Sequence, residues 1–448
     1  MLFNDSSAEY SSAVRPHNSV STQRPAGVAR IGAPADIAAA ALDDVAALER
    51  SLGRRLEIVV QATGHGAGAV VDENTVLFDT ASLADVVVDP VSRVATVGAG
   101  TTWGAVNAAA EKHGLLGLAG SAPSVSVSGY TFAGGIGWLV RRDGLASGSL
   151  RRVHYVDGRG EFRIAEDDAA EQVDRDAIWA FRGAGGVGIA HTLEIDLVPV
   201  PDLHAGLLLW HGSALTELIS AWKSGLPQLG SSVSTSIAVM HVPPVAPFPE
   251  ELHGRVAVHL AVADPDGPDG AAALLDAMRA IANPVVDDWG PKDSAGLARI
   301  HLDPPGASLG VGDARWLDDS TPEAAGRIMT AAATGGSPLV MVEIRHTAGA
   351  PTRRPGAVVT PPGSFIYHAV GSLAVADRES IDAGLAAMHA TWAGADTGVA
   401  PGSWLEAAAT APSALRPDVL ERARKIADRV DPERRIRRSR LLDLVREG

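Results

Sequence analysis

Short apolar runs alternate with amphipathic runs over about the first two hundred residues of the chain. Residues 28–31 predict a strand, and the run that starts at Asp36 predicts a helix because its apolar residues recur every three or four positions. Residues 56–60 predict a second strand, which continues directly into a loop of small residues at 61–68. This succession of strand, helix, strand and glycine-rich loop is typical of an α+β fold.

The same alternation continues beyond this loop. Strand-like runs occur at 75–78, 86–88 and 93–97, and a turn of glycine, alanine and threonine follows at 98–102. A threonine directly before an amphipathic run favours a helix N-terminus, so we expect a helix over residues 103–113. Further strands are expected later in this part of the chain, at 153–156 and 193–198.

Pro199-Val200-Pro201 marks the first expected domain boundary, because the pattern beyond it loosens into separate strands and helices. Those elements are expected at 206–210, 214–222, 256–262, 271–281, 339–343 and 364–370. We therefore divide the chain into a first domain at 1–200, a second at 201–400 and a closing segment at 401–448.

Composition and charge describe a globular protein that does not bind nucleic acid. The chain has 448 residues, of which 46% are hydrophobic and 20% charged, and its net charge is -15. A phosphate backbone would be repelled on average, and no basic stripe with interleaved aromatic residues occurs. The arginines between 422 and 440 are expected to belong to a solvated helix and tail.

Cysteine is absent from the sequence. Its absence excludes disulfides, thiolate nucleophiles and cysteine-ligated metals, and it fits a reducing cytoplasm. The first ten residues are polar, and no run of about 18 apolar residues follows. We therefore expect a cytoplasmic protein that does not interact with membranes.

Several loops of glycine, serine and threonine follow strands, and such loops can aim backbone N–H groups at a phosphate. One literal GxGxxG runs from Gly183 through Gly185 to Gly188, but a Rossmann fingerprint must open a helix, and residues 189–198 read as extended. We therefore expect a dinucleotide cradle without a Rossmann fold. HExxH, GxSxG, P-loop and metal-ligand patterns are absent, so neither a hydrolase nor a metal site is expected.

Four segments carry a family resemblance. They are Gln61-Ala62-Thr63-Gly64-His65, Gly98-Ala99-Gly100-Thr101-Thr102-Trp103-Gly104, Ala122-Pro123-Ser124-Val125-Ser126-Val127-Ser128-Gly129-Tyr130 and Gly134-Gly135-Ile136-Gly137-Trp138. In this order, and with the later Ile178-Trp179-Ala180-Phe181-Arg182-Gly183, they resemble FAD-linked oxidases of the vanillyl-alcohol oxidase type that are related to berberine bridge enzyme. The stretch at 420–442 is similar to the closing segment of that family.

This resemblance implies a two-subdomain FAD-binding domain of the PCMH type, an α+β substrate domain with an antiparallel sheet, and a closing segment that returns to the FAD domain. It also implies a covalent bond between His65 and the 8α-methyl carbon of FAD. Ala122 stands where doubly attached members carry cysteine, so we expect attachment through His65 alone. Val125 stands where valine accompanies oxygen reactivity in related plant enzymes, which favours an oxidase.

The resemblance further implies which residues contact FAD. These are Ala62, Thr63, Gly64, His65, Gly66, Gly68, Gly100, Ala122, Val125, Ser128, Gly129, Gly134, Gly135, Gly137, Trp138 and Ile189. Four other histidines are expected to be ordinary solvated or hydrogen-bonded side chains: His17, His113, His191 and His301.

The family often supplies its catalytic base from a Tyr-x-Asn motif before the closing helix, but residues 404–406 here read Trp-Leu-Glu. Because tryptophan cannot act as a base, we consider three replacements: Tyr130 beside the flavin loop, Tyr367 on a substrate-sheet strand, and Glu406, whose pKa would rise on burial. Further candidates for the pocket wall lie close together in the sequence: Glu343, Arg345 and His346.

The leading hypothesis is an FAD-dependent oxidase that transfers a hydride from an alcohol, phenol or natural-product intermediate to flavin N5, with dioxygen as the acceptor. Two alternatives stay open. One is the same fold used for a non-redox cyclisation, isomerisation or elimination, and the other is a flavin-free binding protein. The expected partners are dioxygen and a small, hydrophobic natural product, and the expected state is a monomer or homodimer.

Overall fold

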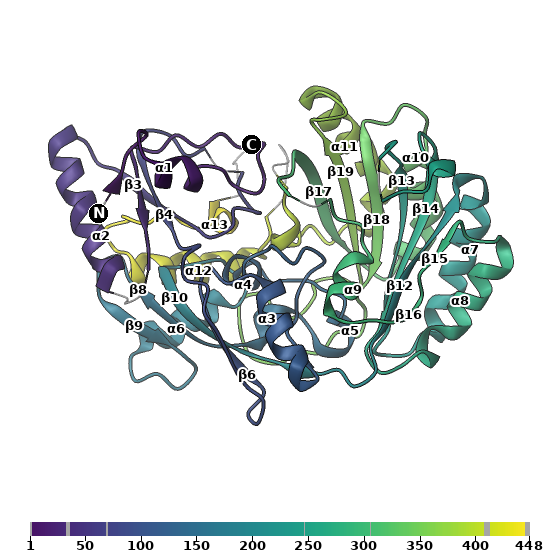
Figure 1. Ribbon diagram of the computed structural model, residues 1–448, viewed down its shortest axis with the longest axis horizontal. Helices are drawn as coiled ribbons and strands as arrows, with labels where there is room; N and C mark the ends of the chain where they lie inside the picture. Colours follow the sequence, from purple (N-terminus) through teal and green to yellow (C-terminus); the bar gives the residue numbers. More distant parts are fainter. Residues whose placement is uncertain are drawn as a thin grey trace.

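The computed structural model describes residues 2–32, 36–68, 70–245, 247–304, 306–406 and 413–443. Over these ranges the chain forms two halves that lie side by side, one coloured purple to blue together with yellow and the other coloured green (Figure 1). The expected α+β class is confirmed, because both halves combine sheets with helices and the second half is built on an antiparallel sheet.

A four-stranded sheet opens the first half. Its strands are β1 (Leu2–Phe3), β2 (Gly27–Arg30), β3 (Glu57–Gln61) and β4 (Thr75–Asp79). The order is β1-β2-β4-β3, and β4 pairs in parallel with both β2 and β3. Helix α2 (Asp36–Leu52) makes the crossover, and its Leu42 and Val45 are buried in one core with Ile58. The loop after Gln61 therefore leaves the carboxyl end of a parallel strand, where α/β sheets commonly bind ligands.

A five-stranded antiparallel sheet completes the first half, in the order β5-β6-β10-β8-β9. Its strands are β5 (Val86–Asp89), β6 (Val94–Gly98), β8 (Leu150–Val156), β9 (Phe162–Ala165) and β10 (Ile189–Asp196). A separate antiparallel pair consists of β7 (Leu115–Leu116) and β11 (Val198–Pro199). The glycine motif at Gly183–Gly188 leads into β10 and not into a helix, so the expectation that it is no Rossmann fingerprint is confirmed.

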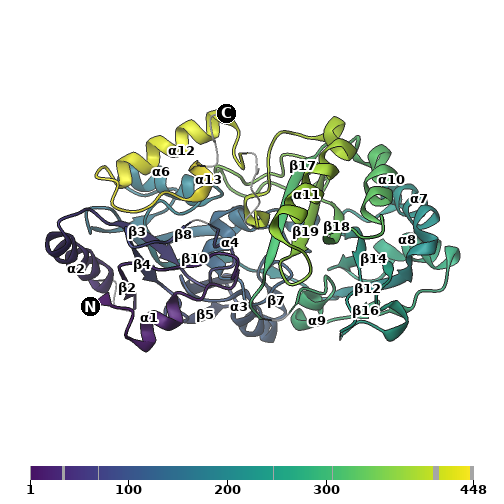
Figure 2. The same cartoon turned by 90° about the horizontal axis from the view of Figure 1, so that it is seen from above.

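Several helices surround these two sheets. They are α1 (Ala8–Ala13), α3 (Trp103–Ala110), α4 (Val127–Phe132), α5 (Val140–Asp143), α6 (Gln172–Phe181), α12 (Pro417–Val430) and α13 (Arg440–Asp443). The hydroxyl of Thr102 accepts a hydrogen bond from the backbone N–H of Ala105 at 3.4 Å and caps α3, as the sequence predicts. Helix α12, near the end of the chain, lies against α6, with the guanidinium of Arg422 3.9 Å from the ring centroid of Trp179 (Figure 2).

The second half is an antiparallel sheet in the order β15-β12-β14-β13-β18-β19-β17, with β16 also paired to β12. Its strands are β12 (His204–His211), β13 (Ser234–His241), β14 (Val256–Asp264), β15 (Val286–Asp287), β16 (Gly290–Pro291), β17 (Gly310–Leu317), β18 (Leu339–His346) and β19 (Phe365–Ser372). Glu343 of β18 pairs in register with His368 of β19. The domain boundaries at 200 and 400 stay predictions, and all strands of this sheet come from residues between them.

Four helices cover the outer face of this sheet: α7 (Leu215–Gly225), α8 (Asp269–Ile281), α10 (Thr321–Ala332) and α11 (Arg378–Trp392) (Figures 1 and 2). Tyr367 and Ala369 of β19 are buried in the core between sheet and helices, whereas His368 between them belongs to the opposite face, which turns toward the first half. The short helix α9 (Ser294–Arg299) precedes the loop that contains Asp303. Within the described ranges, none of the helices is both long and apolar enough to cross a membrane.

The remaining regular segments are short 3₁₀ turns: η1 (Glu111–His113), η2 (Ala146–Ser149), η3 (Gly212–Ala214), η4 (Leu226–Gln228), η5 (Glu250–Leu252), η6 (Ala393–Ala395) and η7 (Gly402–Trp404). Of these, η7 belongs to the segment that lies between the two halves and carries Trp404. It brings the residues that replace the family's Tyr-x-Asn motif to the boundary between the halves.

Residues 16–20 tie the two halves together, and we call this segment the N-terminal strap. The backbone N–H groups of His17 and Asn18 donate to the carbonyl oxygens of Thr63 and Gly64 in the first half, at 3.1 and 3.2 Å. On the other side, the N–H of Ser308 in the second half donates to the carbonyl of His17 at 2.8 Å. The strap therefore bridges the loop after β3 and the segment before β17.

Candidate functional site

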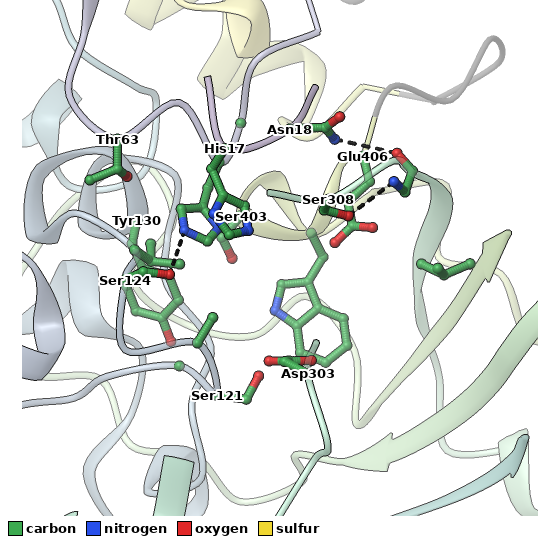
Figure 3. A pocket seen from close by; sticks show the side chains of 18 of the residues that line it. His17, Asn18, Thr63, Ser121, Ser124, Tyr130, Asp303, Ser308, Ser403 and Glu406 are labelled. Carbon is green, nitrogen blue, oxygen red and sulfur yellow. Dashed lines mark hydrogen bonds between the residues drawn. The ribbon is translucent and has the colours of Figure 1, made fainter. Parts of the chain in front are cut away.

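A cavity of about 3290 Å³ lies between the two halves. Its walls come from the N-terminal strap, the loop after β3, residues 117–130, the inner face of the second sheet, and residues 301–304, 306–310, 402–406 and 436–441. Figure 3 shows side chains from these segments pointing toward one another. Because segments so far apart in the sequence converge here, this cavity is the candidate site.

His65 is held in the cavity wall by contacts on two sides. Its imidazole stacks on that of His17, with ring centroids 3.4 Å apart and an angle of 14° between the planes. Its Nε2 lies 3.0 Å from the hydroxyl oxygen of Ser124 (Figure 3). Burial, helped by the neighbouring His17, lowers the pKa of His65 to about 3, so the imidazole is neutral at pH 7.

The loop that carries His65 depends on Gly64. This residue has φ +71°, and a Cβ atom on it would lie 2.6 Å from the Cβ of Pro16 in the strap. Only glycine combines this conformation with so close an approach. The loop is further tied to residues 121–126, since the N–H of Ser126 donates to the hydroxyl of Thr63 at 3.2 Å.

Many of the predicted FAD-contact residues do line this cavity. They are Ala62, Thr63, Gly64, His65, Gly66, Gly68, Ala122, Val125, Ser128 and Gly129. Backbone N–H groups of this wall, such as those of His65, Gly66 and Ala122, make no hydrogen bond to any other described residue. Unused donors between small side chains are the groups that a pyrophosphate requires, so this wall fits FAD.

Six of the predicted FAD contacts do not line the cavity and stay predictions: Gly100, Gly134, Gly135, Gly137, Trp138 and Ile189. The glycines allow close backbone packing behind the wall, as at Gly137, where a Cβ atom would lie 1.9 Å from the carbonyl oxygen of Ala119. Ile189 is fully buried in β10, and its neighbours Gly188 and Ala190 line the cavity in its place.

Tyr130 lines the cavity, and its hydroxyl is buried without a hydrogen-bond partner among the described residues. Its ring packs edge-on against Trp103, with centroids 5.9 Å apart. Burial raises the pKa of Tyr130 above its ordinary value. The hydroxyl therefore stays protonated at pH 7, which suits a hydrogen-bond donor to a ligand and not a base.

Tyr367, the second predicted base, is not in the cavity. Its ring is fully buried on the helix side of the second sheet, with its centroid 5.3 Å from that of Trp392. Successive side chains of a strand point to opposite faces, so it is the adjacent His368 that lines the cavity. The prediction of Tyr367 as a catalytic base is therefore corrected.

Glu406, the third predicted base, lies in the cavity wall. Its backbone carbonyl accepts a hydrogen bond from the N–H of Gly312 at 2.8 Å, which fixes it beside the start of β17. Burial, and then the nearby Asp303, raise the pKa of Glu406 to about 7, although His301 and Arg440 act in the opposite direction. A carboxyl group with this pKa can both accept and release a proton at neutral pH.

A buried chain of charged groups leads from the second sheet to the cavity. Nδ1 of His301 lies 2.6 Å from a carboxylate oxygen of Asp303, and Nε2 lies 3.0 Å from Oε2 of Glu343. The other oxygen of Glu343 accepts a hydrogen bond of 3.0 Å from Nε of Arg345. Glu343 and Arg345 are fully buried, whereas Asp303 lines the cavity.

The protonation states in this chain follow from its contacts. Burial alone would lower the pKa of His301, but Asp303 and Glu343 outweigh it and raise that pKa to about 10. Burial likewise raises the pKa of Asp303, but His301 outweighs it, and the pKa falls to about 2. At pH 7 the chain therefore alternates in charge and holds the Asp303 carboxylate ionised in the cavity.

Arg345 lies between two tryptophans, and this explains the place of Trp138. The guanidinium carbon is 3.9 Å from the ring centroid of Trp138 and 4.5 Å from that of Trp404. Trp138 thus supports Arg345 and does not contact the cavity. Trp404 lines the cavity in the position where the family often has a base, and it packs edge-on against His368 at 4.9 Å.

Residues 33–165 match the model of a family described as FAD binding domain. (R)-6-hydroxynicotine oxidase of Paenarthrobacter nicotinovorans is 27% identical over 222 residues, which cover 48% of this chain and 46% of that protein. Berberine bridge enzyme-like D-2 of Nicotiana tabacum is 32% identical over 197 residues, which cover 41% of this chain and 34% of that protein. The aligned part is thus less than half the length of each relative.

The crystal structure of 6-hydroxy-D-nicotine oxidase from Arthrobacter nicotinovorans has a TM-score of 0.78 at 21% identity, and the match covers 98% of this chain and 96% of that one. The chain is similar to the berberine bridge enzyme-like flavoproteins. A structure of Physcomitrella patens BBE-like 1 also has a TM-score of 0.78, at 16% identity, and covers 100% of this chain and 97% of that one. The whole described chain therefore has the fold of this family.

Several residues of this site could not be recognised from the sequence. His17 and His301 were expected to be ordinary polar side chains, but both line the cavity. Arg440 was expected to be solvated, but it lines the cavity too, and burial lowers its pKa to about 10. Asp303 and His368 do not belong to any of the sequence motifs, and only the fold places them in the cavity wall.

Proposed function

We propose that this protein is an FAD-dependent oxidase in which Glu406 is the catalytic base. The observation that carries the proposal is the position of Glu406 in a cavity that also holds His65, with a pKa raised to about 7. A base with a pKa near the working pH is the most effective in proton transfer. The FAD binding domain and the FAD-linked relatives support the cofactor.

His65 is the proposed point of covalent attachment. Its neutral imidazole retains a lone pair for bond formation, and because Nε2 is engaged with Ser124, Nδ1 is the nitrogen left to bond to the 8α-methyl carbon. The chain contains no cysteine, so a second thioether bond is impossible. The wall of small residues from Ala62 to Gly68 would hold the phosphates of FAD.

When bound, FAD supplies a hydride acceptor that dioxygen can reoxidise. Glu406 removes the hydroxyl proton of an alcohol or phenol at the carboxylate oxygen, while Arg440 stabilises the carboxylate form electrostatically. Asp303 raises the pKa of Glu406, and this keeps the carboxylate basic enough to accept a proton. Tyr130 donates a hydrogen bond into the cavity through its otherwise unused hydroxyl.

The proposed substrate is a small, largely apolar molecule with one hydroxyl group. The inner face of the second sheet offers it apolar side chains, among them Leu207, Met240, Met341 and Val370. The wall also carries polar side chains, among them those of Glu406 and His368. Such a wall suits a phenolic or alcoholic natural-product intermediate.

The cofactor claim is tested by acid precipitation of the purified protein. A yellow pellet is expected for the wild type, and a yellow supernatant above a white pellet for His65→Ala, which should still fold and bind FAD. A white pellet from the wild type would refute the covalent bond. Protein that is colourless and takes up no added FAD would refute the oxidase itself.

The oxidase claim is tested by hydrogen peroxide release with a panel of phenols and benzylic alcohols under air. The wild type should release peroxide with at least one of them, and Glu406→Gln should do so roughly 10²–10⁴-fold more slowly. Conversion of a substrate without peroxide release and without flavin reduction under nitrogen would favour the non-redox cyclisation, isomerisation or elimination instead.

A further inference from the structure

Four large apolar side chains line the cavity and are also exposed to solvent. They are Val70, Val245, Leu309 and Val375, with exposed fractions of 71%, 54%, 39% and 64%. Val70 follows the loop of His65, whereas the other three belong to the second half. We call these three residues the apolar rim. Single exposed apolar residues are ordinary, but three that line one cavity indicate a site for an apolar ligand.

The three residues of the apolar rim lie at one edge of the second sheet. The strands β13, β18, β19 and β17 are antiparallel neighbours in this order, so the end of β13, the start of β18, the end of β19 and the start of β17 meet at this edge. Val245 lies in the loop after β13, Val375 in the turn after β19, and Leu309 directly before β17. Because neighbouring strands are about 4.8 Å apart, the apolar rim extends over about 14 Å.

The apolar rim begins beside the proposed base. The Oε2 atom of Glu406 lies next to Gly310, where an added Cβ would be 3.3 Å from it, and Gly310 directly follows Leu309. The N–H of Leu373 donates to the carbonyl of Leu309 at 3.0 Å, and this bond holds the turn after β19 beside the start of β17. A ligand whose hydroxyl group lies at Glu406 therefore meets the apolar rim as the continuation of its binding surface.

The volume of the cavity leaves room for a long ligand beside FAD. The cavity measures about 3290 Å³, whereas the pocket of a single ligand typically measures about 300–1,000 Å³. FAD and a compact substrate, each in a pocket of that size, would leave part of the cavity unfilled. A chain attached to the substrate would occupy part of this space and would cover the apolar rim.

We propose that the substrate is a phenol with a straight alkyl chain, and that the apolar rim binds this chain while the hydroxyl group lies at Glu406. This inference rests on the proposed function, which supplies the hydroxyl group and its base. Burial of a hydrocarbon chain against the apolar rim removes apolar surface of both partners from water. A compact hydrophilic alcohol would leave the three apolar side chains exposed, so the apolar rim selects for the chain.

The test varies the length of the chain. The probes are phenols with an ethyl, butyl, hexyl or octyl group at the para position, together with their methyl ethers, which lack the proton that the base removes. Peroxide release gives kcat/KM for the phenols, and titration calorimetry gives the dissociation constants of the ethers. Each added methylene should improve both quantities about twofold, or about 60-fold from ethyl to octyl, which corresponds to burial of the chain on one side.

A double variant places charge in the apolar rim. It combines Val245→Asp with Val375→Asp and leaves Leu309 in place, because Leu309 adjoins the site of the base. The ratio between octyl and ethyl probes should fall to less than about 10-fold, since a hydrated carboxylate does not cover a hydrocarbon chain. The matched control is Val91→Asp. Val91 is 92% exposed and lies between β5 and β6 outside the cavity, so this variant should keep the ratio of the wild type.

Equal values for ethyl and octyl probes in the wild type would overturn the proposal, and so would an unchanged ratio in a double variant that melts like the wild type. Ethers that bind more tightly with chain length, without peroxide from any phenol, would support the apolar rim and refute the oxidase. Peroxide release that is independent of chain length would keep the oxidase and refute the role of the apolar rim. Light scattering tests the other occupant: a wild-type dimer that becomes monomeric in the double variant would show that a second copy covers the apolar rim, and would overturn the proposal.

Discussion

Nε2 of His301 donates a 3.0 Å hydrogen bond to the carboxylate of Glu343, and this contact joins the loop after α9 to the middle of β18. Glu343 is fully buried and also accepts a hydrogen bond from Arg345, so one carboxylate neutralises two cations. The position of Asp303 in the cavity depends on this contact, because Asp303 is the next group bonded to His301. Glu343, which does not line the cavity, thus helps to hold the charge of Asp303 inside the cavity.

Replacing Glu343 should destabilise the fold strongly. Glu343→Ala leaves the buried His301 and Arg345 without their shared partner, and breaking a buried ion pair in this way costs about 3–5 kcal/mol. The matched control is Glu57→Ala, whose carboxylate pairs with Arg437 at the surface and should contribute less than about 1 kcal/mol. Urea unfolding measures both, and equal losses in the two variants would contradict this account.

Stability should fall as the pH rises above neutrality, with His301 as one cause. Its folded pKa is raised from 6.5 to about 10, so the protonated form is favoured in the folded state. The stability that this provides is complete below pH 6.5 and is lost as the pH rises toward 10. Free energies of unfolding across this window should decline in the wild type and decline less in His301→Gln. Parallel curves would show that His301 does not contribute.

The rate of substrate oxidation should rise with pH around a midpoint near 7. Glu406 must be deprotonated to act as the base, and its pKa is about 7. Arg440 lowers that pKa, so Arg440→Met should move the midpoint to higher pH. Arg422→Met is the control, because that guanidinium stacks on Trp179 outside the cavity and should leave the midpoint in place. An unchanged profile in Glu406→Gln would remove Glu406 from the mechanism.

The His65 loop could be predicted from the sequence because its requirements are local. A strand that is followed directly by small residues and one histidine can be recognised within a few consecutive residues. Glycine is required at position 64 by its positive φ and by the close approach of Pro16. Gly137 shows the limit of this reasoning, because it does not line the cavity. Glycine motifs show where backbone packs closely, but they do not show whether the neighbour is a ligand or, as here, the carbonyl of Ala119.

The opposite wall could not be predicted because distant segments form it. Strand β13 (Ser234–His241) lies inside the sheet with nearly every residue buried, so it lacks the alternation that marks a half-exposed strand. Choosing Tyr367 over its neighbour His368 required knowing which face of β19 turns toward the cavity, and that depends on pairing with β18. Asp303 acts electrostatically on Glu406 although the two residues are far apart in the sequence, and only the fold brings them near each other.

Gly64→Ala should weaken flavin attachment more than it weakens the fold as a whole. The new Cβ would strain a φ of +71° and would meet Pro16 at 2.6 Å, which displaces the loop of His65 or the strap. Gly53→Ala carries a similar φ of +64° but meets nothing within 4 Å, so it controls for backbone strain alone. Attachment rates from acid-precipitated pellets should fall in the first variant and stay near wild type in the second.

Two tyrosine-to-phenylalanine exchanges should separate the cavity from the core. Both hydroxyls are buried and lack a hydrogen-bond partner among the described residues, but only that of Tyr130 faces the cavity. Tyr130→Phe should lower kcat/KM about 10-fold, the effect of losing one hydrogen bond of about 1.4 kcal/mol to a ligand. Tyr367→Phe should leave activity unchanged and hold or slightly raise the free energy of unfolding, since it removes an unpaired polar group from between sheet and helices. Peroxide release and urea unfolding measure the two effects, and loss of activity in Tyr367→Phe would reinstate that residue as a candidate base.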